Sequence, residues 1–205
     1  MSTPEPGGVS RRAMLKGAGA AAFASVLGRG VQAQDGEEAP AQPKEEGLQS
    51  RGPEAVEVVF TLNGEETKLV VEPRVTLLDA LRDRVGVTGT KRVCDRGACG
   101  ACTVWLDGAT VNACLLLAVD VAGAEVTTIE GLAGEAKLAP IQRAFVQCDA
   151  MQCGFCTSGM LMSCAALLRD VPRPTLEQTK HAVVGNLCRC GTYPHVFHAV
   201  QEAAQ

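Results

Sequence analysis

The stretch that decides the fold of this chain covers residues 91–104 and reads Lys91-Arg92-Val93-Cys94-Asp95-Arg96-Gly97-Ala98-Cys99-Gly100-Ala101-Cys102-Thr103-Val104. Its three cysteines have four and then two residues between them, and Cys114 follows after eleven more. Four thiols with this spacing, three of them on one loop, are typical of a plant-type [2Fe–2S] site. The stretch therefore predicts one such cluster, bound by Cys94, Cys99, Cys102 and Cys114.

Neighbouring residues suit an anionic cluster on this loop. Gly97 and Gly100 permit turns with positive φ and a close approach of backbone N–H groups to the sulfurs. Lys91, Arg92 and Arg96 are expected to offset part of the negative charge. Zinc is the alternative metal, although structural zinc sites more often pair two knuckles in which two to four residues separate the cysteines.

A second group of cysteines follows in the C-terminal part of the chain. Cys153 and Cys156 have two residues between them, and Cys188 and Cys190 have one. The second pair is too tight for most zinc knuckles. Predicted helices begin just after Cys156 and Cys190, and helix N-termini favour anionic groups. The sequence therefore predicts a second cluster on Cys153, Cys156, Cys188 and Cys190.

Composition sets the broad class of the chain. Its 205 residues are 46% hydrophobic and 20% charged, which excludes a largely disordered chain and a polytopic membrane protein. A net charge of −4 gives no indication of nucleic-acid binding. All ten cysteines lie between Cys94 and Cys190. Cys148 and Cys164 belong to neither group, and we expect them to be small buried residues or a thiol pair.

The first 33 residues are predicted to be an export signal. A paired arginine, Arg11-Arg12, precedes a small-residue apolar run at 18–27 and the possible cleavage motif Val31-Gln32-Ala33. This order is typical of a twin-arginine signal peptide and predicts a periplasmic protein. Ten apolar residues are too few to span a bilayer, so no stable membrane span is expected. Residues 34–53, rich in Glu, Gln, Pro, Gly and Ala, are predicted to be a flexible linker.

Residues 54–131 have the pattern of a small mixed sheet. Strands are expected at 56–62, 68–71, 102–106, 110–111 and 125–129, with hairpin turns at Asn63-Gly64 and Asp107-Gly108. Leu77, Leu81 and Val85 share one face of a helix between the hairpins. This order fits a β-grasp fold.

Residues 132–205 show helical patterns instead, at 141–146, 159–168, 176–184 and 194–204. Thr175 and Gln178 form a predicted capping box. The fold class is therefore α+β: a plant-ferredoxin-like β-grasp domain followed by a small helical bundle.

A disulfide framework is the remaining alternative for the cysteines, because export implies an oxidising compartment. Two observations argue against it. Cysteines one or two residues apart are poorly placed to cross-link distant segments. The twin-arginine route also carries proteins that are already folded and loaded with cofactor.

Three stretches of the chain carry a resemblance to a known family. They are 91–104, Gln152-Cys153-Gly154-Phe155-Cys156-Thr157-Ser158-Gly159 and Gly185-Asn186-Leu187-Cys188-Arg189-Cys190-Gly191-Thr192-Tyr193. Together they resemble the small iron–sulfur subunits of the xanthine dehydrogenase family of molybdenum hydroxylases, and the resemblance covers about residues 54–205. With the signal peptide, Ser158 and the segment 128–132, the resemblance points to the periplasmic aldehyde oxidoreductases, although the wider family commonly has proline where Ser158 stands.

The resemblance implies an electron relay rather than a catalytic site. A molybdopterin cofactor in a large partner subunit would oxidise the substrate. The two [2Fe–2S] clusters, the helical one nearest molybdenum, would pass the electrons to FAD or a cytochrome in another partner. Gln152 would contact the pterin, whereas His181, His195 and His198 are expected on helix surfaces. A free-standing two-cluster carrier and a zinc- or disulfide-stapled binding protein are the other candidate functions.

Overall fold

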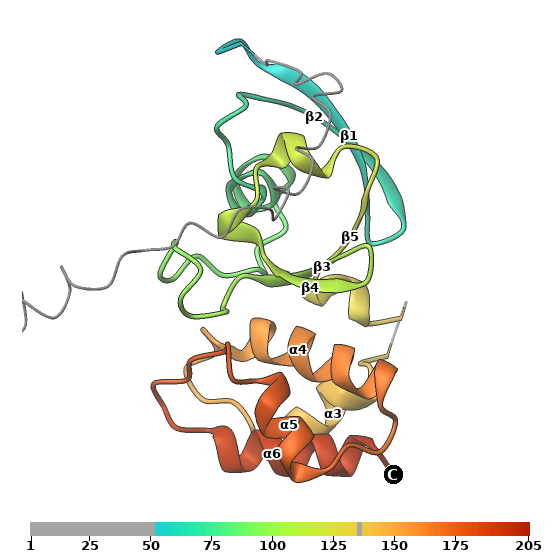
Figure 1. Cartoon of the computed structure of the whole chain (residues 1–205). Coiled ribbons are helices and arrows are strands. Elements are labelled where there is room, and N and C mark those ends of the chain that lie inside the picture. Colours follow the sequence, from blue (N-terminus) through green and yellow to red (C-terminus); the bar gives the residue numbers. More distant parts are fainter. Residues whose placement is uncertain (1–51, 135–136) are drawn as a thin grey trace, which may run out of the picture. The chain divides into compact units, whose positions relative to one another are not determined.

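The computed structural model describes residues 52–134 and 137–205 (Figure 1). The predicted signal peptide (1–33) and all but the end of the predicted linker (34–53) lie outside these residues. A sheet with short helices comes first along the chain, and helices α3 to α6 follow. This order confirms the predicted α+β class with a β-grasp-like sheet followed by helices.

The sheet is mixed, with β1 parallel to β5 and all other neighbours antiparallel. Its order is β2-β1-β5-β3-β4. The parallel pair needs a long crossover, and that connection contains the cysteine loop and the helix between the hairpins. The strands, in sheet order, are β2 (Glu65–Val71), β1 (Val56–Leu62), β5 (Glu125–Thr127), β3 (Thr103–Leu106) and β4 (Ala109–Asn112).

Both predicted hairpin turns are confirmed. Asn63 and Gly64 have φ of 52° and 87°, and Asp107 and Gly108 have φ of 48° and 81°. Two successive residues with positive φ match the right-handed twist of the strands that they join. Along β1 the buried residues alternate, so Val58 faces the core of the sheet domain.

The predicted helix at 77–85 is present but changes character along its length. A single α-turn, α2 (Leu77–Asp79), continues as the wider π-helix η1 (Ala80–Val85). The Thr76 hydroxyl caps the start by accepting from the N–H of Asp79 at 3.1 Å. Gly86, with φ of 85°, ends the helix. The apolar spacing indicates which face is buried, but it does not indicate the wider turn.

The predicted last strand at 125–129 is too long, because the strand ends at Thr127. The N–H of Thr128 donates to Asn63 Oδ1 at 2.8 Å, and its hydroxyl donates to Glu130 Oε2 at 2.7 Å. These side-chain hydrogen bonds take the place of the hydrogen bonds between strands, and the chain continues as a short 3₁₀ helix. The three short 3₁₀ helices of this half are η2 (Ala113–Leu115), η3 (Ala118–Val121) and η4 (Ile129–Leu132).

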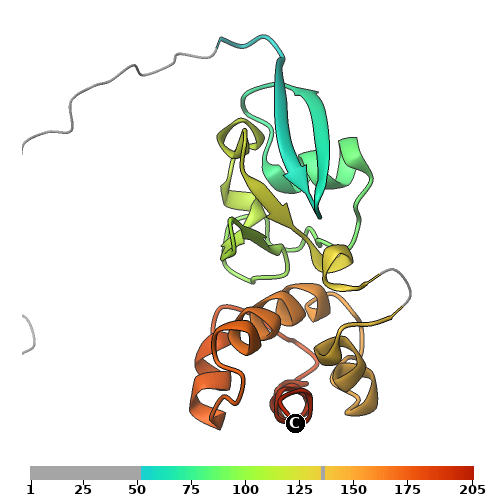
Figure 2. The same ribbon diagram turned by 90° about the vertical axis from the view of Figure 1, so that its right-hand side faces the viewer.

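The second half packs four helices around its own core, with α6 against α3 (Figure 2). Phe145 and Val196 are fully buried there. The predicted capping box is confirmed, since Thr175 N–H donates to Gln178 Oε1 and Gln178 N–H donates to Thr175 Oγ1. The helices are α3 (Pro140–Gln147), α4 (Thr157–Asp170), α5 (Leu176–Ala182) and α6 (Tyr193–Ala203).

Each half has its own hydrophobic core, one with members at residues 58–126 and the other at 141–200. The predicted division at residues 131–132 falls between these two sets and stays a prediction. None of the helices in the described ranges has the length and apolar character that a bilayer crossing requires.

The two halves contact each other where α4 lies against β3 and β4 (Figure 2). Trp105, the single tryptophan of the chain, donates its indole N–H to the Met162 carbonyl at 3.0 Å. The guanidinium of Arg169 lies 4.9 Å from the Trp105 ring centroid and donates to the Gly108 carbonyl at 2.9 Å. Arg169 therefore ties the end of α4 to the second hairpin.

This contact predicts that Arg169→Ala destabilises the chain by about 1 kcal/mol, because the partly exposed cation–π contact and the hydrogen bond to Gly108 are lost. The exposed ion pair of Arg169 with Asp170 adds little to this change. Urea unfolding followed by Trp105 fluorescence measures the change in the free energy of unfolding. Arg173→Ala, at an exposed arginine in the next loop, is the matched control and should stay at the wild-type value. Equal stability of the two variants would contradict the role given to Arg169.

Candidate metal centres

The structure brings together the four cysteines of the first predicted group. Three of them are buried and Cys94 is half-buried. The thiols approach in pairs: Cys94 lies beside Cys99, and Cys102 lies beside Cys114. Cys114 reaches the loop because η2 begins directly after β4, which pairs with β3 just beyond Cys102. The β3–β4 hairpin therefore returns the fourth thiol to the cysteine loop.

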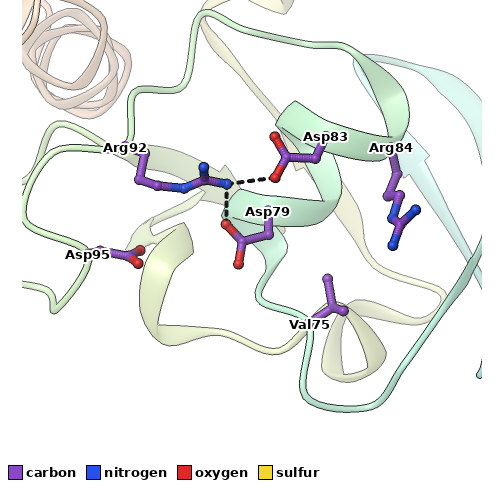
Figure 3. Close-up of a pocket in the computed structure, with 6 residues that line it drawn as sticks. All are labelled: Val75, Asp79, Asp83, Arg84, Arg92 and Asp95. Atoms are coloured by element: carbon purple, nitrogen blue, oxygen red, sulfur yellow. Dashed lines mark hydrogen bonds and ion pairs between the residues drawn. The ribbon is translucent and has the colours of Figure 1, made fainter. Parts of the chain in front are cut away.

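Two arginines fix the chain that leads into this loop. Arg82, on η1, donates to the carbonyls of Thr88 and Thr90 at 2.8 and 2.7 Å. Arg92 forms ion pairs with Asp79 and Asp83, across a surface hollow of about 620 Å³ (Figure 3). The helix between the hairpins thus anchors the segment immediately before Cys94.

The expectation for the three basic residues needs a correction. The aspartates hold the guanidinium of Arg92 (Figure 3), and the Lys91 ammonium donates to the Thr88 carbonyl at 2.9 Å. Arg96 alone of the three contacts a ligand residue, donating from Nε to the Cys94 carbonyl at 3.0 Å. The sequence places these charges near the cysteines but does not indicate that acidic partners on the helix compete for them.

Backbone N–H groups of the loop point at its sulfurs, as an anionic group requires. The N–H of Gly97 donates to Cys114 Sγ at 3.2 Å. Bonding to backbone N–H groups, that of Arg96 first, lowers the pKa of Cys94 to about 7. The predicted positive φ of Gly97 and Gly100 is confirmed, at 71° and 67°.

The second group of four cysteines also converges in pairs. Cys153 lies beside Cys190, and Cys156 lies beside Cys188. The outer pair is exposed and the inner pair is half-buried. Helix α4 begins immediately after Cys156, as predicted in outline, although it starts two residues earlier than expected. Burial opposes ionisation of Cys188, but hydrogen bonds with Thr192, Cys156 and Cys190 together outweigh it and lower the pKa of Cys188 to about 7.

Each group thus contains at least one thiol whose pKa is lowered and at least one whose pKa is raised. Burial is the main cause that raises the pKa of Cys102 and of Cys156 to about 12. Iron binds the thiolate form, so binding at these two thiols displaces a proton. Within the described ranges, no three side chains of His, Cys, Asp or Glu converge on a point that would hold a single metal ion. Paired thiols with inward N–H donors fit a two-iron cluster.

The two cysteine groups sit on loops in direct backbone contact. A Cβ on Gly100 would lie 2.4 Å from the Gly185 carbonyl oxygen, and a Cβ on Gly159 would lie 2.0 Å from the Gly100 oxygen. The N–H of Leu187 donates to the Cys99 carbonyl at 2.9 Å. Cys99 belongs to the first group and Leu187 precedes Cys188 of the second, so one hydrogen bond joins the two candidate centres.

The sequence patterns do not single out Asn186, which contacts the first cysteine loop in the fold. It is 3% exposed, donates from Nδ2 to the Gly100 carbonyl at 2.9 Å and accepts from the Ser163 hydroxyl at 2.8 Å. The only available signal is its place in the stretch 185–193, where an asparagine two residues before a predicted ligand has no assigned role.

The other predicted residues lie outside the two groups. Gln152 is exposed beside Cys153. Cys164 is fully buried in the helical core, where burial raises its pKa to about 12, and Cys148 packs against the same core. No disulfide joins any of the ten cysteines, all of which lie in the described ranges. The three histidines are exposed on α5 and α6, as expected: His181, His195 and His198.

Comparison with known proteins shows which family this chain belongs to. Residues 60–126 match the 2Fe-2S iron-sulfur cluster binding domain, and residues 128–201 match the [2Fe-2S] binding domain. The chain is 42% identical to the aldehyde oxidoreductase iron-sulfur-binding subunit PaoA of Escherichia coli K12, over 74% of this chain and 73% of that subunit. The chain belongs to the small iron–sulfur subunits of the molybdenum hydroxylases.

Two further relatives place this iron–sulfur subunit among oxidoreductases. It is 45% identical to the nicotine 6-hydroxylase small subunit of Paenarthrobacter nicotinovorans, over 72% of this chain and 89% of the relative. The quinoline 2-oxidoreductase structure from Pseudomonas putida 86 superposes with a TM-score of 0.72 at 42% identity, covering 74% of this chain and 93% of that one. The iron–sulfur subunit therefore has two [2Fe–2S]-binding domains and transfers electrons within an oxidoreductase.

The contact at Gly100 predicts a graded series of glycine substitutions. In Gly64→Ala the new Cβ meets open space, so only the strain of a positive φ lowers the free energy of unfolding, by about 1 kcal/mol. Gly159→Ala adds no backbone strain but collides with the Gly100 carbonyl, and overpacking costs about 1–3 kcal/mol. Gly100→Ala combines both penalties and should lower the free energy of unfolding most.

Denaturant unfolding of the three variants measures this order. Gly64→Ala is the matched control for Gly100→Ala, because both glycines have positive φ and only Gly100 lies against another backbone. A Gly100→Ala variant no less stable than Gly64→Ala would show that the two loops are not in contact.

Proposed function

We propose that this subunit relays single electrons from the molybdopterin site of a large partner subunit, through a cluster on the helical half and then one on the sheet half, to FAD or a cytochrome. Similarity to an aldehyde oxidoreductase subunit supports an aldehyde as the partner's substrate. The contact between the two cysteine loops carries the proposal, because it brings both candidate centres together within one chain.

The pairing of the thiols assigns the ligands. Bound to four thiolates, a [2Fe–2S] cluster supplies a one-electron carrier. Each pair would hold one iron, which gives two pairs per cluster. The pairs would be Cys94 with Cys99, Cys102 with Cys114, Cys153 with Cys190, and Cys156 with Cys188.

Exposure supports the order of the relay. Cys153 and Cys190 are exposed, so the helical centre is the one that a partner can approach closely. Phe155, between Cys153 and Cys156 in the sequence, is also exposed and would be covered on docking. Cys188 is covalently joined to Leu187, and the Leu187 N–H donates a hydrogen bond to the Cys99 carbonyl. The chain's own backbone thus provides a short connection from the helical centre to the sheet centre.

The ligand assignment predicts about four irons per chain and two distinct EPR signals after reduction. Cys99→Ser should disturb one signal and leave the other. Cys148→Ser, at a half-buried cysteine outside both groups, is the matched control and should keep both signals. Zinc in place of iron, or a single cluster in the wild-type chain, would contradict the ligand assignment.

Gln152 is proposed to contact the pterin. It is exposed directly before Cys153, and its neutral amide can both donate and accept hydrogen bonds. Loss of one such bond costs on the order of 0.5–1.5 kcal/mol. Gln152→Ala should therefore slow reduction of the clusters by substrate in the complex, with four irons retained. Gln147→Ala, also exposed, should have no effect. Reduction of the Gln152→Ala complex at the wild-type rate, with molybdenum retained, would remove this role.

Export through the twin-arginine route is proposed from Arg11-Arg12 and the apolar run after it. Replacing both arginines by lysine should leave the chain in the cytoplasm with its clusters assembled. Cell fractionation with an iron assay measures both properties. Arg29→Lys keeps the pair intact and should be exported. Normal export of the double variant would contradict a periplasmic location reached by this route.

A further inference from the structure

The Gly100 carbonyl lies between two cysteines of the first group, yet a residue of the helical half holds it. It accepts from Asn186 Nδ2 at 2.9 Å and from the Thr103 hydroxyl and N–H at 2.7 and 3.2 Å. Ser163 on α4 fixes the Asn186 amide from the other side by donating to its Oδ1. The orientation of this peptide group therefore depends on a side chain about 86 residues further along the chain.

The same peptide group carries the N–H of Ala101. A trans peptide is planar, so its N–H points away from its C=O. With the Gly100 oxygen held toward Asn186, the Ala101 N–H faces the opposite side. Ala101 is 3% exposed, and no atom of the described residues accepts a hydrogen bond from this N–H. Buried backbone N–H groups are nearly always paired, so this donor requires an acceptor that residues 52–134 and 137–205 do not provide.

We propose that Asn186 is a positioning residue for the first cluster, which it reaches through the Gly100–Ala101 peptide. The inference rests on the proposed function, because the acceptor of the Ala101 N–H is the group that Cys94, Cys99, Cys102 and Cys114 hold. Hydrogen bonds to cluster sulfurs are among the factors that set the reduction potential, and a donor stabilises the more negative, reduced form. A residue of the helical half thereby raises the potential of the cluster in the sheet half.

The potential of each cluster, from an EPR redox titration of the full chain, distinguishes this role from a structural one. Asn186 stands two residues before Cys188, so a merely local disturbance would change the second cluster. In Asn186→Ala we expect the potential of the first cluster to fall and that of the second to stay unchanged. At the midpoint potential of the wild-type first cluster, the ratio of reduced to oxidised first cluster should fall about threefold or more. Cys99→Ser identifies which signal belongs to the first cluster.

Other variants separate the two sides of the Asn186 amide. In Asn186→Asp the ionised carboxylate can still accept from the Ser163 hydroxyl but cannot donate to the Gly100 carbonyl. This variant should therefore lower the potential of the first cluster at least as much as Asn186→Ala does. Ser163→Ala keeps the donor and should have a smaller effect. Asn63→Ala is the matched control, because Asn63 also bonds through its side chain to a distant residue, Thr128, but away from the cysteine loops. Both of its clusters should titrate as in the wild type.

If Asn186→Ala fails to assemble the first cluster, Thr103→Val decides the question, because it removes the other side-chain donor to the same carbonyl and should lower the same potential. The proposal is overturned if a fully loaded Asn186→Ala chain keeps the wild-type potential of the first cluster, if both clusters shift equally, or if Thr103→Val has no effect. A wild-type chain without two clusters would instead overturn the proposed function.

Discussion

The close contact of backbone with backbone at Gly100 is the constraint on which the rest of this structure depends. A side chain at Gly159 would push α4 away from the cysteine loop, and one at Gly100 would push that loop away from Gly185 and Asn186. With none there, consecutive carbonyls of the loop, those of Cys99 and Gly100, accept from consecutive residues of the helical half, Leu187 and Asn186. Two domains with separate cores become one compact unit.

The elements around this contact hold each cysteine group in place from several directions. The hairpin of β3 and β4 returns Cys114 to its loop, and the ion pairs of Arg92 anchor the approach to Cys94. On the helical side, the Tyr193 hydroxyl accepts from the Cys188 N–H and donates to the Asn186 carbonyl. Each cysteine loop is therefore fixed by hydrogen bonds that do not involve the thiols. The thiols are left available for iron.

Much of this arrangement could be predicted from the sequence, because its signals are local. Asn63-Gly64 and Asp107-Gly108 specify hairpin turns, and Thr175 with Gln178 specifies a helix start. Cysteine spacing sorts eight thiols into two groups, and the members of each group lie close together in the fold. The family resemblance, carried by those same motifs, was also confirmed.

The features that could not be predicted depend on partners far apart in the sequence. Arg92 was expected to offset the cluster charge, but its aspartate partners on the preceding helix become close only in the fold. The last strand ends at Thr127 because the N–H of Thr128 donates to the side chain of Asn63, which is 65 residues away in the sequence. The role of Asn186 depends on Gly100 in the same way. Local pattern gives the elements and the ligands, whereas the polar contacts between halves require the folded chain.

The central claim is that one chain holds both centres close enough to exchange electrons internally. Reducing the isolated full chain with less than one electron equivalent, and freezing samples over time for EPR, tests this claim directly. The account predicts that the electron distributes over both cluster signals at a rate independent of protein concentration. Redistribution that speeds up in proportion to concentration, or an electron that stays on one cluster despite a favourable potential, would contradict it.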